Sequence, residues 1–274
     1  MIVLVTGCRS GFGLHIAVRA ARAGHTVYAG LRDLSTKDAL LEAAAGLDVR
    51  PVQLDVVDEA QQRDAVDAIV AEHGRLDALV NNAGVALGGF WEQVEEDELR
   101  RLFDVNVFAP WALTKRCLPH LRAVGREGIV INVTSMAGRQ AMPGLGMYAA
   151  SKFALEGMTE ALRHELRPFG VRVVLVEPGP YRTDIFGRNR TVAKNADDAS
   201  PYAPYLAKLE AVVAKLEPKM GDPVEVADLV VRLLTDPRPR LRYPLGPGVP
   251  ARLWARRVLP FEGVEKIIQR VVGF

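Results

Sequence analysis

Tyr148 and Lys152 are the residues of this chain whose types and spacing most clearly allow chemistry. They stand four residues apart, so in a helix they share one face. A phenol titrates near pH ~10, and a cation one helical turn away would favour the phenolate and lower that pKa. Ser135, at the end of an apolar run, could hold a substrate oxygen opposite the phenol. A tyrosine and a lysine also reach this spacing by chance, so the pair needs support from its surroundings.

A glycine-rich loop follows the first apolar run of the chain. Residues 6–13 read TGCRSGFG and lead directly into a helical pattern. Glycines placed in this way allow a tight turn and let the backbone approach a pyrophosphate at a helix N-terminus. The loop therefore predicts a dinucleotide site. Its predicted contact residues are Gly7, Arg9, Ser10, Gly11, Phe12 and Gly13.

The end of the second apolar run indicates which dinucleotide binds. An acidic residue at this place usually takes the ribose 2′-hydroxyl of NAD. Here Leu31 occupies the place, Arg32 follows it, and Arg9 lies in the glycine loop. Two guanidinium groups can bracket a 2′-phosphate, so NADP is favoured over NAD. Asp33, one residue further on, is the main argument for NAD.

The composition excludes several classes of function. The chain has 274 residues, 49% of them hydrophobic, and a net charge of +2, which offers no electrostatic argument for nucleic acid. No apolar run approaches the ~20 residues that span a bilayer. Cys8 and Cys117 are too few for a disulfide framework and suggest a reducing compartment, so we expect a cytoplasmic protein. The five histidines are scattered without ligand spacing, and we expect no metal site.

Short apolar runs alternate with helical patterns along most of the chain. The runs at 2–5, 26–29, 49–54, 78–80, 128–133 and 171–176 predict strands that are covered on both faces. Helices are predicted near 12–23, 36–45, 59–73, 96–124 and 147–168. This alternation predicts an α/β fold of three layers with a doubly wound parallel sheet. The glycine loop, the Leu31-Arg32 segment and Ser135 lie at the carboxyl ends of predicted strands, where such sheets bind ligands.

The pattern changes after the last predicted strand. Residues 185–221 show no strand pattern and contain three prolines, so we expect a helical lid that covers the substrate. We assign residues 1–237, lid included, to a single nucleotide-binding domain. Residues 238–274 are an Arg- and Pro-rich extension that ends in an amphipathic helix and is expected to pack near the substrate mouth. Contact of this extension with a membrane surface is the alternative.

Taken together, these motifs make the chain resemble the short-chain dehydrogenase/reductase family, in its single-domain type with a Rossmann fold. The resemblance spans residues 1 to about 235. It rests, in the family's order, on residues 6–13, Asp55-Val56, residues 81–84 (NNAG), Asn106, Ser135, Tyr148, Lys152, Pro178-Gly179 and Thr183. The segments YAGLRD at 28–33 and EPGP at 177–180 are similar to the 17β-hydroxysteroid and retinol dehydrogenase branch.

The resemblance implies a role for each of the catalytic residues. Tyr148 would be the general acid/base, and Lys152 would lower its pKa and bind the nicotinamide ribose. Ser135 would hold the substrate oxygen. Asn106 would hold a water that links Lys152 to solvent.

The resemblance also implies contacts with the cofactor. Asp55 would meet the adenine amino group beside Val56, and Asn82, Ala83 and Gly84 would line the adenosine ribose. Pro178, Gly179 and Thr183 would bracket the nicotinamide. The implied function is an NADP(H)-dependent oxidoreductase that acts on a carbonyl or a secondary alcohol.

The segments expected to face the nicotinamide are mostly apolar, which favours a hydrophobic substrate. They are 85–87, 138–145, 180–181 and 185–186. Arg139 and Gln140 could instead anchor a polar group. By resemblance we expect a homodimer or homotetramer. The alternatives are a catalytically silent NADP-binding regulator and a sugar-nucleotide epimerase or dehydratase, the latter requiring a larger C-terminal domain than this chain has.

Overall fold

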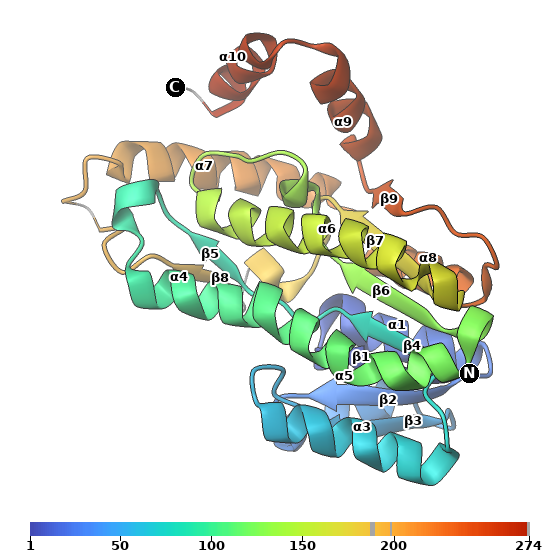
Figure 1. Cartoon of the computed structure of the whole chain (residues 1–274). Helices are drawn as coiled ribbons and strands as arrows, with labels where there is room; N and C mark the ends of the chain where they lie inside the picture. The colour runs from blue at the N-terminus through green and yellow to red at the C-terminus, as the bar shows by residue number, and fades with distance from the viewer. Residues whose placement is uncertain (187–189, 198, 273–274) are drawn as a thin grey trace.

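A seven-stranded parallel sheet forms the centre of the computed structural model, which describes residues 1–186, 190–197 and 199–272 (Figure 1). The strand order is β3-β2-β1-β4-β6-β7-β9. The strands are β1 (Ile2–Thr6), β2 (Thr26–Leu31), β3 (Val49–Gln53), β4 (Ala78–Asn81), β6 (Ile129–Val133), β7 (Arg172–Pro178) and β9 (Arg242–Leu245). The predicted doubly wound sheet is confirmed. Its order reverses direction between β1 and β4, which is where such sheets open a ligand crevice.

Helices cover both faces of the sheet because successive side chains of each strand point to opposite sides. In β1, Val3 and Val5 face α1 (Gly11–Arg22) and α8 (Pro223–Thr235). Leu4 faces the other way, into the core that α3, α5 and α6 cover. Figure 1 shows these three helices in front of the sheet, with α1 and α8 behind it. Their bounds are Glu59–His73 for α3, Ala109–Ala123 for α5 and Gly146–Leu166 for α6, and the short α2 covers Asp38–Ala43.

The helix predicted over 96–124 is not continuous. It consists of α4 (Glu96–Phe103), a π-helical turn (Asp104–Phe108) and α5. The wider turn contains Asn106, which is 1% exposed. Single π-turns inside helices are often found at functional sites. The hydrophobic periodicity of the sequence did not reveal the turn, because the one additional residue in a π-helical turn barely shifts the apolar stripe along the helix.

The prediction that residues 185–221 contain no strand is wrong. β8 (Arg190–Val192) pairs in parallel with β5 (Ala86–Gly88) to form a small second sheet. Neither strand could be read from the sequence, since each has three residues and β8 offers only one β-branched apolar side chain. The same region contains α7 (Ala203–Leu216). Residues 187–189 and 198 of the predicted lid lie outside the described residues.

The tail contributes to the sheet as well. β9 pairs with β7, with Leu175 opposite Arg242 and Pro178 opposite Leu245. The predicted domain boundary at 237/238 therefore cuts one strand off the sheet. Beyond β9 lie α9 (Val249–Val258) and α10 (Phe261–Val272), which Figure 1 shows at the upper end of the molecule. Within the described part of the chain, no helix combines the length and the apolar character required to cross a membrane.

Candidate active site

A cleft of about 320 Å³ opens at the carboxyl ends of the strands. Most of the predicted site residues line it, although they come from distant parts of the sequence. They are Gly7, Arg9, Ser10, Gly11, Phe12, Arg32, Asp55, Val56, Asn82, Ala83, Gly84, Ser135, Tyr148, Lys152, Pro178, Gly179 and Thr183. Gly13 and Asn106 are not among the lining residues. These two residues lie behind the residues that line the cleft.

The glycine loop is held closely against the neighbouring strand ends. Gly7 has a φ of +72°, a conformation that glycine adopts without strain. A Cβ on Gly13 would lie 2.3 Å from the carbonyl oxygen of Gly7, so no other residue fits there. The Asn82 side chain donates hydrogen bonds to the carbonyl oxygens of Thr6 (2.8 Å) and Gly7 (3.3 Å). Asn82 therefore fixes the loop and also lines the cleft.

The end of the cleft next to the glycine loop and β2 carries both positive and negative side chains. Arg9, Arg32 and Asp33 all line it. The Asp33 carboxylate accepts a hydrogen bond from the backbone N–H of Ser35 (2.9 Å), and bonds to Ser35 lower its pKa. Asp33 is thus an ionised neighbour of the two arginines. At the same end, the Asp55 carboxylate accepts from the Val57 N–H at 3.2 Å.

Ser135 and Tyr148 meet at the other end of the cleft, where their side chains share a hydrogen bond. Ser135 is fixed by its position at the end of β6, where its Oγ accepts from the backbone N–H of Ala137 (3.1 Å). Tyr148 is 3% exposed. Burial raises its pKa to about 12, because the phenolate is poorly solvated there, and the Ser135 bond acts in the opposite direction.

Lys152 lies beside this pair on α6. Its ammonium nitrogen is 5.9 Å from the centre of the Tyr148 ring and donates to the Val133 carbonyl oxygen at 3.4 Å. Burial lowers its pKa to about 8. The ammonium group stands near the Tyr148 ring and not against its hydroxyl, and burial is the largest effect on the Tyr148 pKa. The lowering of that pKa by Lys152 stays a prediction.

Asn106 is bound to the backbone that follows β4. Its Oδ1 accepts from the Val85 N–H (3.0 Å), and its Nδ2 donates to the Val85 carbonyl (2.9 Å) and to Ser151 Oγ (3.1 Å). A Cβ on Gly84 would stand 3.3 Å from Asn106 Oδ1 and 3.4 Å from Lys152 Nζ. Gly84 thus lets the π-helical turn and the lysine approach one another.

The turn after β7 completes the wall of the cleft. Thr183 Oγ1 is buried and has no hydrogen-bond partner among the described residues. The backbone N–H of Gly179 donates to the Leu245 carbonyl of the tail (2.9 Å), and a Cβ on Gly179 would lie 2.3 Å from Val249. The tail therefore packs against this turn, a contact that the sequence pattern did not indicate.

Several residues important to the site were missed by sequence reasoning. Arg139, considered as a substrate anchor, instead forms an ion pair with the buried Glu177 at 3.1 Å. Glu156 and Arg242 belong to the same buried group. Only the position of Glu156, four residues after Lys152 and hence on the same helical face, could have pointed to it.

The residues present fit a dinucleotide. Gly7 and Gly13 leave no room for a Cβ, so the loop can turn tightly before the N-terminus of α1 at Gly11, where a pyrophosphate would approach. Thr183 offers an unpaired buried hydroxyl of the kind that a carboxamide would satisfy. No group of three or more potential metal ligands occurs in the described ranges.

Comparison with known proteins agrees with this geometry. Residues 1–194 match the family model described as short chain dehydrogenase. An uncharacterized oxidoreductase, YusZ of Bacillus subtilis, is 41% identical over 98% of this chain and 97% of its own length. Human 17-beta-hydroxysteroid dehydrogenase type 1 is 38% identical over 88% of this chain and 76% of its own. The crystal structure of a short chain dehydrogenase/reductase from Burkholderia phymatum in complex with NAD superimposes with a TM-score of 0.81 at 27% identity, covering 93% of this chain and 92% of that one.

Proposed function

Because this chain belongs to the short-chain dehydrogenase family and is an oxidoreductase acting on CH–OH groups, we propose that it is an NADP(H)-dependent reductase of hydrophobic carbonyl compounds. One observation carries the proposal. Ser135, Tyr148 and Lys152 come together at one end of a cleft whose other end contains Arg9 and Arg32. The silent regulator is disfavoured, because no member of this catalytic set is missing.

A nicotinamide held in this cleft would supply the hydride, and the protein would orient and polarise the carbonyl. Ser135 Oγ and the Tyr148 hydroxyl both donate to the carbonyl oxygen, and Tyr148 delivers its proton as the alcohol forms. Lys152, largely protonated at neutral pH, stabilises the phenolate that remains. Asn106 would hold the water that reconnects Lys152 to solvent, using its main chain because its amide is engaged with Val85.

The preference for NADP rests on the two arginines at the adenosine end. Arg9 and Arg32 can both donate to a 2′-phosphate, whereas Asp33 would repel it. Asp33 is already engaged with Ser35, and its charge is opposed by both guanidinium groups. We therefore propose that the attraction of Arg9 and Arg32 for a 2′-phosphate outweighs the repulsion from Asp33, so that NADPH binds more tightly than NADH.

The preference for a hydrophobic substrate rests on the walls beside Tyr148. Val85 and Ile185 line the cleft there and pack on a small apolar cluster that includes Leu87, Met147 and Tyr148 itself. Arg139 is held by Glu177 and so does not offer its charge to a substrate. The α7 helix of the predicted lid approaches the 143–145 loop, where a Cβ on Gly144 would lie 2.6 Å from Leu209. Reduction is the proposed direction, and the cytoplasm, where NADPH is available, the proposed location.

The experiment that tests this function is a panel of ketones and alcohols assayed with both cofactors, following the absorbance of the reduced nicotinamide. We expect turnover of steroid-like, fatty or aromatic ketones. Activity restricted to small polar sugars would refute the substrate class.

In the same assay, Tyr148→Phe should reduce turnover at least ~10²-fold, the usual scale for losing a general acid, while NADPH still binds. Tyr28→Phe is the matched control, since its hydroxyl bonds Glu72 away from the cleft. Unchanged turnover in Tyr148→Phe would contradict the mechanism.

A further inference from the structure

Two buried carboxyl groups lie behind the catalytic residues. Glu156, on α6, and Glu177, on β7, have side chains that are 4% and 0% exposed. They lie within hydrogen-bonding reach of one another, and this bond forms only when one of the two carboxyl groups carries a proton. Burying two carboxylates together is costly unless cations and donors compensate them. We call Glu156 and Glu177 the carboxyl pair.

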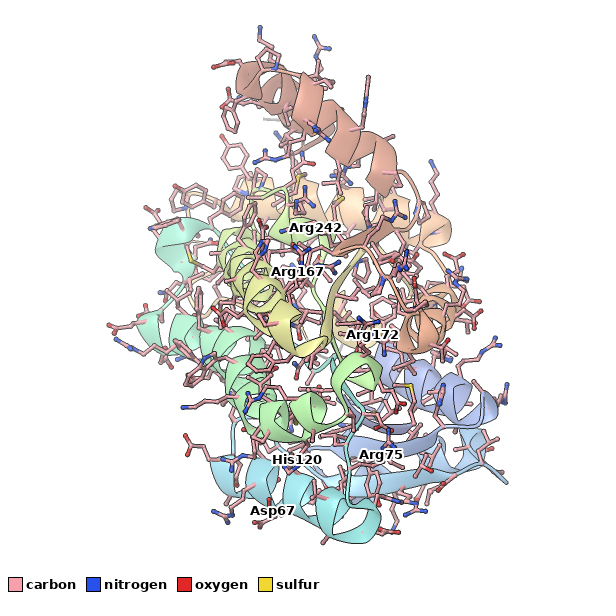
Figure 2. The ribbon with its side chains drawn as sticks, turned by 45° about the vertical axis from the view of Figure 1, so that its right-hand side comes forward. Asp67, Arg75, His120, Arg167, Arg172 and Arg242 are labelled. Atoms are coloured by element: carbon pink, nitrogen blue, oxygen red, sulfur yellow. The ribbon has the colours of Figure 1, made fainter. Side chains whose placement is uncertain are left out.

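Arg242 bridges the carboxyl pair. Its Nε lies 3.1 Å from Glu156 and 3.2 Å from Glu177, and its Nη2 lies 2.8 Å from Glu160. Arg139 adds a second cation on the Glu177 side. Arg242 comes from β9, beyond the last motif of the family, and Figure 2 shows it where the tail meets the body of the protein.

Glu156 also lies next to the two segments that carry Ser135 and Lys152. Thr134 Oγ1 donates to Glu156 at 2.6 Å, and the next residue is Ser135. On α6, Glu156 lies one turn after Lys152. The Ser135 segment packs directly on this turn, because a Cβ on Gly138 would lie 2.9 Å from Glu156 Cγ and 3.1 Å from the Lys152 carbonyl oxygen. A movement of the Glu156 side chain would therefore shift the positions of both Ser135 and Lys152.

The electrostatics of these groups are linked. Burial and the neighbouring Glu177 raise the pKa of Glu156 to about 7, and Arg242 opposes that rise. Burial lowers the pKa of Lys152 to about 8, and the charge of Glu156 opposes that fall. The charge state of Glu156 thus bears on the proton affinity of Lys152 close to neutral pH.

We propose that Arg242 is a positioning residue for catalysis: by bridging Glu156 and Glu177 it holds Glu156 in place behind Lys152 and Ser135 and favours the ionised form of Glu156. The tail strand β9 thereby sets the proton affinity of the catalytic lysine. This inference rests on the proposed function only in that Lys152 is taken to be catalytic. The effect of Arg242 on the pKa of Lys152 does not depend on a known substrate.

The test measures the titration of Lys152 directly, by NMR of protein labelled with carbon-13 at the lysine ε-carbons. The chain has eight lysines, and loss of one signal in Lys152→Met assigns it. In Glu156→Gln the pKa of Lys152 should fall by on the order of one unit, since a carboxylate one helical turn away is lost. Arg242→Gln should lower it in the same direction, because Glu156 then retains its proton to higher pH.

Three comparisons complete the design. The double variant Glu156→Gln/Arg242→Gln should shift Lys152 no further than Glu156→Gln alone, since Arg242 acts through Glu156. Arg242→Lys should restore much of the original pKa. Arg238→Gln, an exposed arginine in the same segment, is the control and should change nothing.

An unchanged Lys152 pKa in Arg242→Gln, with only a lower melting temperature, would reduce Arg242 to a structural residue and overturn the proposal. A raised pKa would do the same, because it would mean that Arg242 acts on Lys152 directly as a like charge. If no carbonyl compound is turned over, the proposed function fails while the NMR result still decides this inference. If a substrate is found, the pH profile of kcat should move with the Lys152 pKa.

Discussion

Tyr148 illustrates at the scale of one residue how burial and partners compete. Burial raises its pKa to about 12, and the hydrogen bond with Ser135 acts against that rise. The phenol is therefore a protonated donor at neutral pH, as reduction requires. Lys152, with a pKa near 8, keeps its charge below that pH and can stabilise the phenolate once the proton has left. Sequence spacing predicted that the two residues share a helix face, whereas burial shifts their pKa values in opposite directions, upward for Tyr148 and downward for Lys152.

A prediction at the same scale concerns Arg32. Arg32→Ala should weaken NADPH binding by roughly tenfold to a hundredfold, the range for one lost hydrogen bond to a charged group, and change NADH binding little. Fluorescence titration with both cofactors measures the two affinities. Arg63→Ala, an exposed arginine on α3 paired with Asp64, serves as the control. Equal weakening of both cofactors would refute the NADP preference.

At the scale of elements, the apolar strands were predictable and the supports of the site were not. β1, β4 and β6 are continuous buried runs, so composition and length identify them. β9 reads RYPL and is only half-buried, which gives no such signal. It becomes a strand because β7 offers it hydrogen-bonding partners, such as the Leu175 N–H that donates to the Leu241 carbonyl. Pairing between segments more than sixty residues apart cannot be read from local periodicity.

The junction between β1 and α1 supports a second prediction. Gly13→Ala should destabilise the protein by about 1–3 kcal/mol and weaken NADPH binding, because the new Cβ meets the backbone of Gly7, which cannot move aside like a side chain. Thermal denaturation and cofactor titration measure the two effects.

Gly157→Ala is the matched control, since its Cβ would meet nothing within 4 Å inside α6. It should raise stability by roughly 0.5–1 kcal/mol through helix propensity. A harmless Gly13→Ala would show that the close approach of the loop to α1 is not required.

In the molecule as a whole, α5, α6 and the π-helical turn before α5 carry large aromatic side chains in contact with solvent. Phe108 is 56% and Trp111 is 51% exposed, and Phe153 on α6 is 39% exposed. Exposed aromatic side chains of this size are enriched at protein interfaces. We propose that a second copy of the chain covers them in a homodimer.

Trp111→Glu should weaken that dimer by tenfold or more, on the scale of losing one aromatic anchor at roughly 2 kcal/mol. Light scattering coupled to size-exclusion chromatography reports the mass. Trp91→Glu, which changes an 82% exposed tryptophan outside α5 and α6, should leave the mass unchanged. A wild-type monomer at all concentrations would contradict the proposal.

The α/β class, six of the seven strands of the large sheet and the glycine loop could be read directly from the sequence, because β-branched runs and a glycine loop before a helix are local patterns. Other lining residues of the cleft, such as Asp55, Asn82 and Thr183, were expected there only through the resemblance to the family. The burial that raises the Tyr148 pKa, the engagement of Arg139 with Glu177 and the ion pairs of Arg242 from the tail became visible only in the folded structure. Burial and ion pairing depend on which distant segments pack together, and that information lies in long-range contacts, not in spacing along the chain.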